Sequence, residues 1–229
     1  MALNQQSLDF LFENRLQDSR EWFLAHKKEY ETLVKQPMTA LSAAIGPRLL
    51  MVDDQLVIDP AVGKTVSRIR RDTRFTRDKS LYRDNLWIAY RRREEGYPPP
   101  CLYFEVFSSG MFRYGCGYYH TTPAYMEILR RRVLAGAPDW QAAQRALDGA
   151  AEFSLTGERY KRPHYPDADP VKQNWLELRE VSVSAEVHDL SLLFSDRLAD
   201  AVAAGLLKLA PVYRFLLATA QAAPPPRRR

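Results

Sequence analysis

Apolar residues recur at helical spacing over residues 7–34, with a polar interruption near the middle of this stretch. Ser19 is a suitable N-cap for the helix that follows the interruption, because its hydroxyl can accept a backbone N–H group of the first turn. A third helical pattern starts near Pro37, a residue type favoured in a first turn, and Pro47 predicts a break or kink in it. The chain is therefore expected to begin with helices.

The pattern changes to period two after Val66, which indicates strands. The predicted strands comprise residues 56–58, a segment that starts at Val66, and residues 86–90, 102–107, 111–119 and 181–187. The tripeptide at residues 108–110, Ser-Ser-Gly, is typical of a turn that joins two strands in a hairpin. Gly115 and Gly117 in the second strand of this hairpin indicate a bulge or a close approach of another backbone segment.

Further helices are expected at residues 123–134, 140–147, 171–178 and 195–220. Asp169 is placed to cap the third of them, and Pro211 interrupts the last. Helices at both ends with hairpins between them favour an α+β fold, as a single domain with a largely antiparallel sheet and flanking helices. The domain is expected to span residues 1–222, and the tail rich in Pro and Arg, residues 223–229, is expected to be disordered.

The composition is that of a globular protein, with 46% hydrophobic and 27% charged residues in a chain of 229. No apolar stretch reaches about 20 residues, the length of a membrane helix, and the first residues lack the pattern of a signal peptide. We therefore expect a cytoplasmic protein that contacts no membrane. Cys101 and Cys116 can meet across a hairpin, but without a secretion signal they are expected to be reduced thiols. The histidines and cysteines show no metal-ligand spacing, so no metal site is expected, and no cofactor is identified.

Positive charge is concentrated in one part of the chain. Residues 64–93 contain eleven Lys or Arg and three Asp, a net charge of +8, whereas the whole chain carries +5. The remainder is therefore slightly acidic. Such a patch attracts phosphate groups, nucleic acid or another acidic partner. It is equally the composition of a solvated face on which Arg and Asp side chains pair with one another.

The chemistry of this patch lies in residues 68–85, RIRRDTRFTRDKSLYRDN, called the charged segment below. The planar guanidinium of arginine stays charged and forms bidentate bonds with phosphates and carboxylates. The candidate ligand-binding residues are Arg68, Arg71, Arg74, Lys79 and Arg83. Asp72 and Asp78 have two candidate roles, which are to orient the arginines or to act as a general base or metal ligand. Phe75 and Tyr82, together with Trp22, are predicted to be buried anchors of the segment, and the Tyr82 hydroxyl is a further candidate ligand contact.

Other candidate residues are isolated in the sequence. His120, near a predicted strand end, is a candidate general acid or metal ligand, or else a hydrogen-bonded surface histidine. Cys116, between two glycines, is a candidate nucleophile. Tyr97, Tyr118 and Tyr119 are candidate surfaces for stacking. The motifs of a P-loop and of a dinucleotide-binding turn are both absent from the sequence.

The charged segment matches the pattern R-x-x-R-D-T-R-F-[ST]-x-D-K-x-x-Y-[RK]-x-N, which resembles the core signature of a mostly bacterial family, domain of unknown function 2461. The resemblance extends from about residue 7 to residue 217. It includes the Arg-Glu-Trp-Phe run that starts at Arg20, the glycine-bearing hairpin strand, and the Tyr-Lys-Arg-Pro run that starts at Tyr160. Leu81 replaces the proline usual before the motif tyrosine, and Pro163-His164-Tyr165 replaces a Pro-Lys-Gly triad. The resemblance implies an α+β domain and assigns no catalytic residue.

Three functions are compatible with these residues. The first is a domain that binds an anionic, phosphate-bearing small molecule or nucleic acid through the arginine and lysine cluster. The second is an enzyme acting on an anionic substrate, with Asp72 or Asp78 as acid–base group and Tyr82 or His120 beside it. The third is a structural network of ion pairs that binds no ligand. Arginines without partners beside a concave surface would favour the first two, and arginines fully occupied by carboxylates would favour the third.

Overall fold

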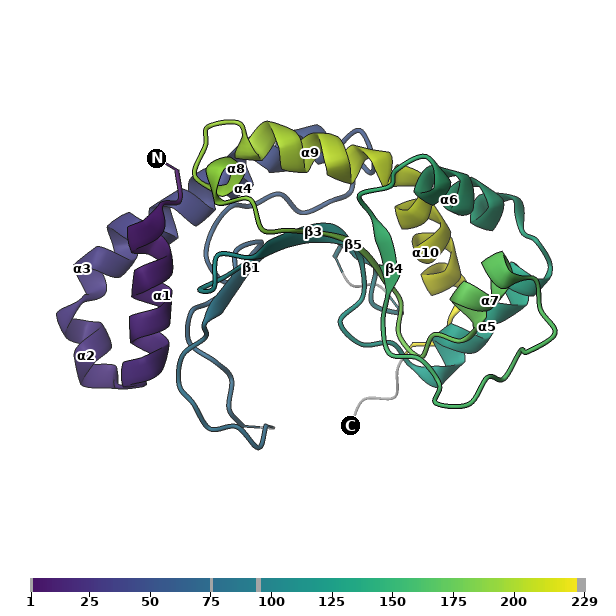
Figure 1. Ribbon diagram of the computed structural model, residues 1–229, viewed down its shortest axis with the longest axis horizontal. Coiled ribbons are helices and arrows are strands. Elements are labelled where there is room, and N and C mark those ends of the chain that lie inside the picture. The colour runs from purple at the N-terminus through teal and green to yellow at the C-terminus, as the bar shows by residue number, and fades with distance from the viewer. Residues whose placement is uncertain (1, 75, 94–95, 226–229) are drawn as a thin grey trace.

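Five strands form one antiparallel sheet in the computed structural model, which describes residues 2–74, 76–93 and 96–225 (Figure 1). The order across the sheet is β1-β2-β3-β5-β4. The strands are β1 (Asn85–Tyr90), β2 (Cys101–Phe107), β3 (Phe112–Gly117), β4 (Ser154–Thr156) and β5 (Ser182–Val187). The predicted hairpin is confirmed, because β2 pairs with β3 from Val106 opposite Phe112 to Cys101 opposite Gly117. Two predictions, the anchor Phe75 and the end of the tail at residues 226–229, fall outside the described residues.

Helices precede the sheet, as predicted. They are α1 (Gln5–Gln17), α2 (Arg20–Ala25), α3 (Lys27–Glu29), a π-helical turn η1 (Tyr30–Lys35) and α4 (Gln36–Leu49). Asn4 and Ser7 form a capping box at the start of α1, and the predicted cap of α2 is confirmed, since Ser19 Oγ accepts the backbone N–H of Trp22 at 3.3 Å. Pro47 lies inside α4 without ending it, so the predicted break there is wrong.

The helices after β3 alternate with the remaining strands. They are α5 (Pro123–Leu134), α6 (Pro138–Asp148), α7 (Pro170–Leu176), α8 (Leu190–Leu193), α9 (Leu198–Lys208) and α10 (Ala210–Ala222). The predicted interruption near Pro211 is confirmed as a bend of 56° between α9 and α10. Within the described residues, no single helix has the length and apolarity to cross a membrane, although this bent pair together meets both criteria. The fold is the predicted α+β domain.

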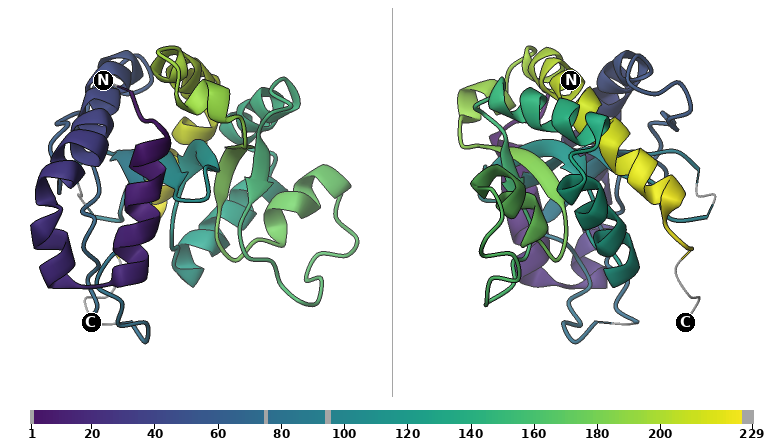
Figure 2. Two further views of the ribbon diagram at one scale, coloured as in Figure 1. Left: turned by 60° about the vertical axis from the view of Figure 1, so that its left-hand side comes forward. Right: turned by 90° about the vertical axis from the view of Figure 1, so that its right-hand side faces the viewer.

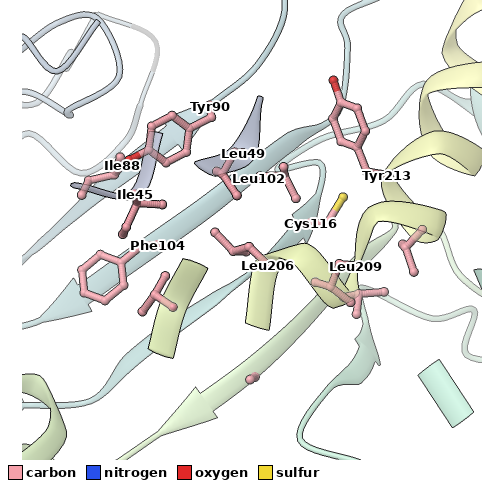
Figure 3. Close-up of a cluster of buried hydrophobic side chains, with 14 of the residues drawn as sticks. Ile45, Leu49, Ile88, Tyr90, Leu102, Phe104, Cys116, Leu206, Leu209 and Tyr213 are labelled. Atoms are coloured by element: carbon pink, nitrogen blue, oxygen red, sulfur yellow. The ribbon is translucent and has the colours of Figure 1, made fainter. Parts of the chain in front are cut away.

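The main core lies between the sheet and helices α4 and α9. Leu86, Ile88 and Tyr90 alternate along β1 and are buried on this side. The Tyr90 hydroxyl donates to the carbonyl oxygen of Ser42 in α4 at 2.9 Å. Figure 3 shows side chains from the sheet and both helices meeting there, among them Ile45, Leu49, Ile88, Phe104 and Leu206. These helices therefore fix one face of the sheet.

The opposite face of the sheet is concave, and in Figures 1 and 2 none of the described helices lies across it. Helices α1 to α3 stand at one end of the arch, and α5, α6, α7 and α10 gather at the other. Strand register and alternation place on this concave face, among others, the side chains of Trp87, Tyr103, Glu105, Arg113, Ser182 and Ser184. Several of these side chains are polar, and they lie on the face of the sheet that the core helices do not cover.

Gly115 and Gly117 allow β5 to come unusually close to β3. A Cβ atom at Gly115 would overlap the carbonyl oxygen of Val183, and one at Gly117 would overlap the backbone of Ser182. The predicted close approach is confirmed, whereas the alternative of a bulge is wrong, because β3 pairs without interruption on both sides. Missing Cβ atoms at these two positions let the sheet bend into its concave shape.

Three strand predictions need correction. Residues 56–58 form no strand, although Val57 donates its backbone N–H to the carbonyl of Arg91 at 3.0 Å. The segment from Val66 forms only isolated bridges, one of them with Ile88 on the outer edge of β1. The second hairpin strand ends at Gly117 rather than at residue 119. Two elements were missed, because β4 and α8 are each too short to show a period.

Candidate functional site

The two arms of the charged segment run antiparallel to each other beside β1. Arg71 N donates to the Leu81 carbonyl at 2.8 Å, and Arg83 N donates to the Ile69 carbonyl at 3.0 Å, around a bridge between Arg70 and Tyr82. Side chains alternate along such arms, and directly opposed residues share a face. Arg70 and Tyr82 therefore lie on one face, and Arg71 and Arg83 lie on the other.

The Tyr82 face packs against the N-terminal helices. The Tyr82 ring stacks on Phe23 of α2 with centroids 5.0 Å apart, and only 3% of Tyr82 is exposed. Asp18, at the end of α1, accepts the backbone N–H groups of Leu81 at 2.7 Å and Tyr82 at 3.1 Å. The prediction that Tyr82 is a buried anchor is confirmed, and Trp22 is partly buried against the same core. The hydroxyl of Tyr82 is thus on the side away from Arg71 and Arg83.

Carboxylates occupy some of the candidate arginines. Asp78 pairs with Arg71 and, at 3.5 Å, with Arg15 of α1. Asp72 binds Arg74 through two bonds of 3.0 and 2.7 Å. Hydrogen bonds from Ser80 and then from Arg71 lower the pKa of Asp78, and the bond from Arg74 lowers the pKa of Asp72 to about 2. Both carboxylates are therefore ionised at neutral pH and are weak bases.

The other two candidates, at the tip and at the start of the segment, lie apart from these pairs. Lys79 Nζ donates to the Thr73 carbonyl at 2.8 Å, which holds the tip of the segment together. Arg68 is exposed, and its guanidinium lies over Gly63, where an added Cβ would be 2.9 Å from Arg68 Nε. Lys79 and Arg68 therefore extend the basic surface on either side of the paired arginines.

Arg83 has a different environment. Its guanidinium carbon lies 4.5 Å from the centre of the Trp87 ring, so the side chain covers part of the concave face. Its Nε atom is buried and has no hydrogen-bond partner, and no ion pair joins Arg83 to any other residue that the structure describes. Burial, and next the positive charge of Arg71, lower the pKa of Arg83. Its Nε is therefore desolvated without a hydrogen-bond partner, while the charge of Glu105 acts in the opposite direction and favours the protonated guanidinium.

Glu105 favours the charged form of Arg83 through its own charge, while its carboxylate is hydrogen-bonded to other residues. Its carboxylate accepts Asn85 Nδ2 at 2.5 Å and Arg113 Nε at 2.7 Å. Glu105 is 8% exposed and lies between Trp87 and Arg113 in the strand register. Next to this row, the Tyr103 hydroxyl lies 3.2 Å from Ser182 Oγ across the two glycines of β3. The concave face thus carries an internally neutralised Glu–Arg pair and a row of hydroxyl groups.

His120, Tyr118 and Tyr119 follow β3, whereas Tyr97 precedes β2. His120 is exposed, and its Nδ1 lies 2.6 Å from Glu180 Oε1, which matches the description of a hydrogen-bonded surface histidine. Tyr97 is buried and stacks on Tyr125 with centroids 4.9 Å apart, and Tyr118 packs edge-on against the same ring. Neither ring is free for stacking. Tyr119 is 86% exposed and remains a candidate.

The structure therefore brings together two of the five predicted ligand-binding residues, Arg71 and Arg83, and adds Trp87 beside Arg83. Trp87 was missed, although the pattern of β1 contains a signal for it. The strand alternates Leu86, Ile88 and Tyr90 toward the core, so a tryptophan out of phase with them must lie on the other face. Cys116, the candidate nucleophile, is buried, and burial raises its thiol pKa, which disfavours the reactive thiolate.

Among the residues that the structure describes, no group of three or more His, Cys, Asp or Glu side chains is arranged to hold a metal ion. No curated protein matches the chain. A family model does match, over residues 6–215, and its description is that of a conserved hypothetical protein, DUF2461. The match covers the charged segment, the whole sheet and the helices up to the middle of α10. The chain belongs to the DUF2461 family.

Proposed function

We propose that the protein binds an anionic, phosphate-bearing ligand through Arg71 and Arg83, at the edge of the concave face. The observation that carries the proposal is the buried Nε of Arg83, which has no partner among the described residues. The proposed compartment is the cytosol, in keeping with the free thiols of Cys101 and Cys116. Nucleic acid is a ligand of the same chemical class, since its backbone presents the same phosphate groups.

The environment of Arg83 costs stability unless an anion is present. A buried N–H group without a hydrogen-bond partner keeps the cost of its desolvation. A phosphate would offset that cost, because the guanidinium forms bidentate, charge-assisted bonds with phosphate oxygens. Trp87 supports the flat face of the guanidinium and so helps to fix its position on the concave face. The nearby Arg71 adds a second positive charge.

The remaining basic residues have a supporting role in this proposal. Arg74, Lys79 and Arg68 are exposed, and two of them are held by Asp72 and by the Thr73 carbonyl. Exposed charges of this kind raise the local concentration of an anion without contacting it, and salt screens their effect. The ligand is thus expected to approach over the charged segment and to bind at Arg83.

The two alternatives receive different support. No contact favours an enzyme that uses Asp72 or Asp78 as a base, because both carboxylates are held by arginines and have lowered pKa values. The structural network is represented by the Arg71–Asp78–Arg15 and Arg74–Asp72 pairs. Those pairs do not include Arg83, so network and ligand site can coexist in one segment.

The test is calorimetric titration with inorganic phosphate and ribose 5-phosphate on three variants. Arg83→Met keeps an apolar stem over Trp87 and should weaken binding about tenfold to a hundredfold, as expected for lost charge-assisted bonds. Arg71→Gln should also weaken binding, and Arg74→Gln is the matched control that should bind as the wild type does. Binding by the wild type should weaken as salt rises.

Stability separates the proposal from a purely structural role. Arg83→Met removes a buried atom without a partner, so its melting temperature should equal or exceed that of the wild type. A variant that melts lower while the wild type binds neither probe would reject the ligand site in favour of the structural network. Equal binding by Arg83→Met and wild type would also reject it.

A further inference from the structure

The concave face presents aromatic rings next to the phosphate site. Trp87 is partly buried in the middle of β1, under the guanidinium of Arg83. Tyr119 is 86% exposed, and its ring packs against the edge of His120 with ring centroids 4.4 Å apart. A tyrosine ring so exposed contributes little to the fold, whereas exposed rings at binding sites provide large contact areas.

Tyr119 and Arg83 approach the concave face from opposite ends of the strands. Arg83 immediately precedes β1, next to the turn of the β2–β3 hairpin, and Tyr119 follows β3 at the open end of the hairpin. The two side chains nevertheless lie close enough for the Tyr119 hydroxyl to affect the pKa of Arg83. Trp87, on the concave face, lies under the same guanidinium.

Hydroxyl groups line the floor between them. Tyr103 and Ser182 contact each other across Gly115 and Gly117, and Ser184 lies opposite Gly115 in the register. Burial raises the pKa of Tyr103, so its hydroxyl stays protonated and can donate at neutral pH.

We propose that the concave face binds a nucleotide, whose base stacks on Tyr119 or on the Arg83–Trp87 pair while its phosphate is held by Arg71 and Arg83. The inference rests on the proposed phosphate site and adds a base-binding subsite to it. Bases stack on aromatic rings and on guanidinium planes with little preference for sequence, and an open sheet face with such rings is a common platform for them. The hydroxyls of Tyr103, Ser182 and Ser184 suit a ribose.

The first experiment compares ribose 5-phosphate with AMP and UMP by calorimetric titration. Stacking should make at least one nucleotide bind about tenfold tighter than ribose 5-phosphate. Tyr119→Ala should reduce nucleotide affinity toward that of ribose 5-phosphate and leave ribose 5-phosphate binding unchanged. If ribose 5-phosphate binds and neither base adds affinity, the nucleotide inference fails while the phosphate site stands. If no probe binds, both fail.

The second experiment uses tryptophan fluorescence, because a stacked base next to Trp87 should quench its emission. AMP should quench the wild type, and the quench should disappear in Trp87→Phe. Trp22→Phe is the matched control, since Trp22 stacks on His26 of α2 and lies off the sheet, and it should retain the quench. A quench that survives in Trp87→Phe would overturn the placement. Titration with a single-stranded trinucleotide then shows whether the ligand is a free nucleotide or part of a nucleic acid. Tighter binding of the trinucleotide than of AMP indicates a nucleic-acid ligand, and equal binding indicates a free nucleotide.

Discussion

Arg83 is partly buried and Arg130 is buried, and the two arginines differ in their hydrogen-bond partners. Arg130, on α5, is 6% exposed and donates from Nε to the Leu176 carbonyl at 2.9 Å and from Nη2 to the Leu178 carbonyl at 2.6 Å. These carbonyls lie at and just after the end of α7, where the helix dipole favours a positive charge. Backbone carbonyl partners of this kind indicate a structural role for Arg130. Arg83 Nε has no such partner among the described residues, which makes Arg83 a candidate for ligand binding.

This contrast predicts opposite effects of one substitution at the two sites. Arg130→Met removes three charge-assisted bonds, to the carbonyls of Leu176 and Leu178 and to the Tyr160 hydroxyl, and leaves buried carbonyls without donors, so we expect a loss of about 2–4 kcal/mol of unfolding free energy. Arg83→Met, its matched counterpart, should change the unfolding free energy by less than about 1 kcal/mol or increase it. Urea denaturation of both variants checks the difference. Equal losses at the two positions would contradict the assignment of Arg83 to a ligand.

At the scale of elements, the curvature of the sheet depends on β3. Gly115 sits where a side chain would collide with the backbone of β5 on one side, while Tyr103 of β2 crosses over it from the other. Any Cβ would push the two strands apart and flatten the arch. The same residue therefore sets the shape of the sheet and the space above its concave face.

Gly115→Ala should accordingly destabilise the protein by about 3 kcal/mol, toward the upper end for steric overpacking. The control is Gly149→Ala at the end of α6, where an added Cβ meets nothing closer than 3.5 Å and φ is −87°. That change should stay within about 1 kcal/mol of the wild type. Thermal unfolding of the pair measures both effects. A Gly115→Ala protein as stable as its control would show that the strands separate freely there.

The accuracy of the sequence predictions follows the strength of the local pattern. The helix beginning at Pro123 and the hairpin around residues 108–110 have a cap, a turn and a clear period, and they were located closely. The segment from Val66 alternates as a strand does, but it pairs with the outer edge of β1 only at isolated positions. Edge pairing depends on tertiary contacts that a single sequence does not encode in its period.

The site was predictable in its composition and not in its geometry. The sequence does not distinguish among the candidates Arg71, Arg74 and Arg83, because all three carry the same charge and lie in the same short segment. Only the antiparallel arms of the segment separate them, by placing Arg71 with Arg83 and leaving Arg74 with Asp72 at the tip. Trp87 joins the site through the neighbouring strand, which is why its contact with Arg83 could be found only in three dimensions.

For the whole molecule, one buried cluster links three distant parts of the chain. Asp53, 6% exposed and just after α4, accepts two bonds from Arg92 after β1, at 2.5 and 2.8 Å. The same carboxylate accepts the Tyr213 hydroxyl of α10 at 2.5 Å. The C-terminal helix is thereby fixed to the N-terminal half of the domain, on the core side of the sheet, where Figure 3 shows Tyr213 beside Cys116.

The final prediction concerns Asp53→Asn and its dependence on pH. Burial acts to raise the pKa of Asp53, but the bonds from Arg92 and Tyr213 outweigh it, so the pKa in the folded protein is lowered. The unfolded chain has a pKa of about 3.9, so the ionised carboxylate stabilises the fold above that pH, and this contribution is lost as the pH falls through the lower, folded value. At neutral pH the variant should lose about 3 kcal/mol, as expected when one partner of a buried ion pair is removed.

The loss should shrink when unfolding is measured toward pH 3, because Asp53 of the wild type then becomes protonated as well. Asp200→Asn is the matched control, since it removes an exposed pair with Arg48 and should change stability by less than about 1 kcal/mol at neutral pH. Urea titrations of the three proteins at pH 7 and pH 3 make the comparison. A stability loss for Asp53→Asn that stays constant over this range would show that packing of the side chain, rather than its charge, holds α10 in place.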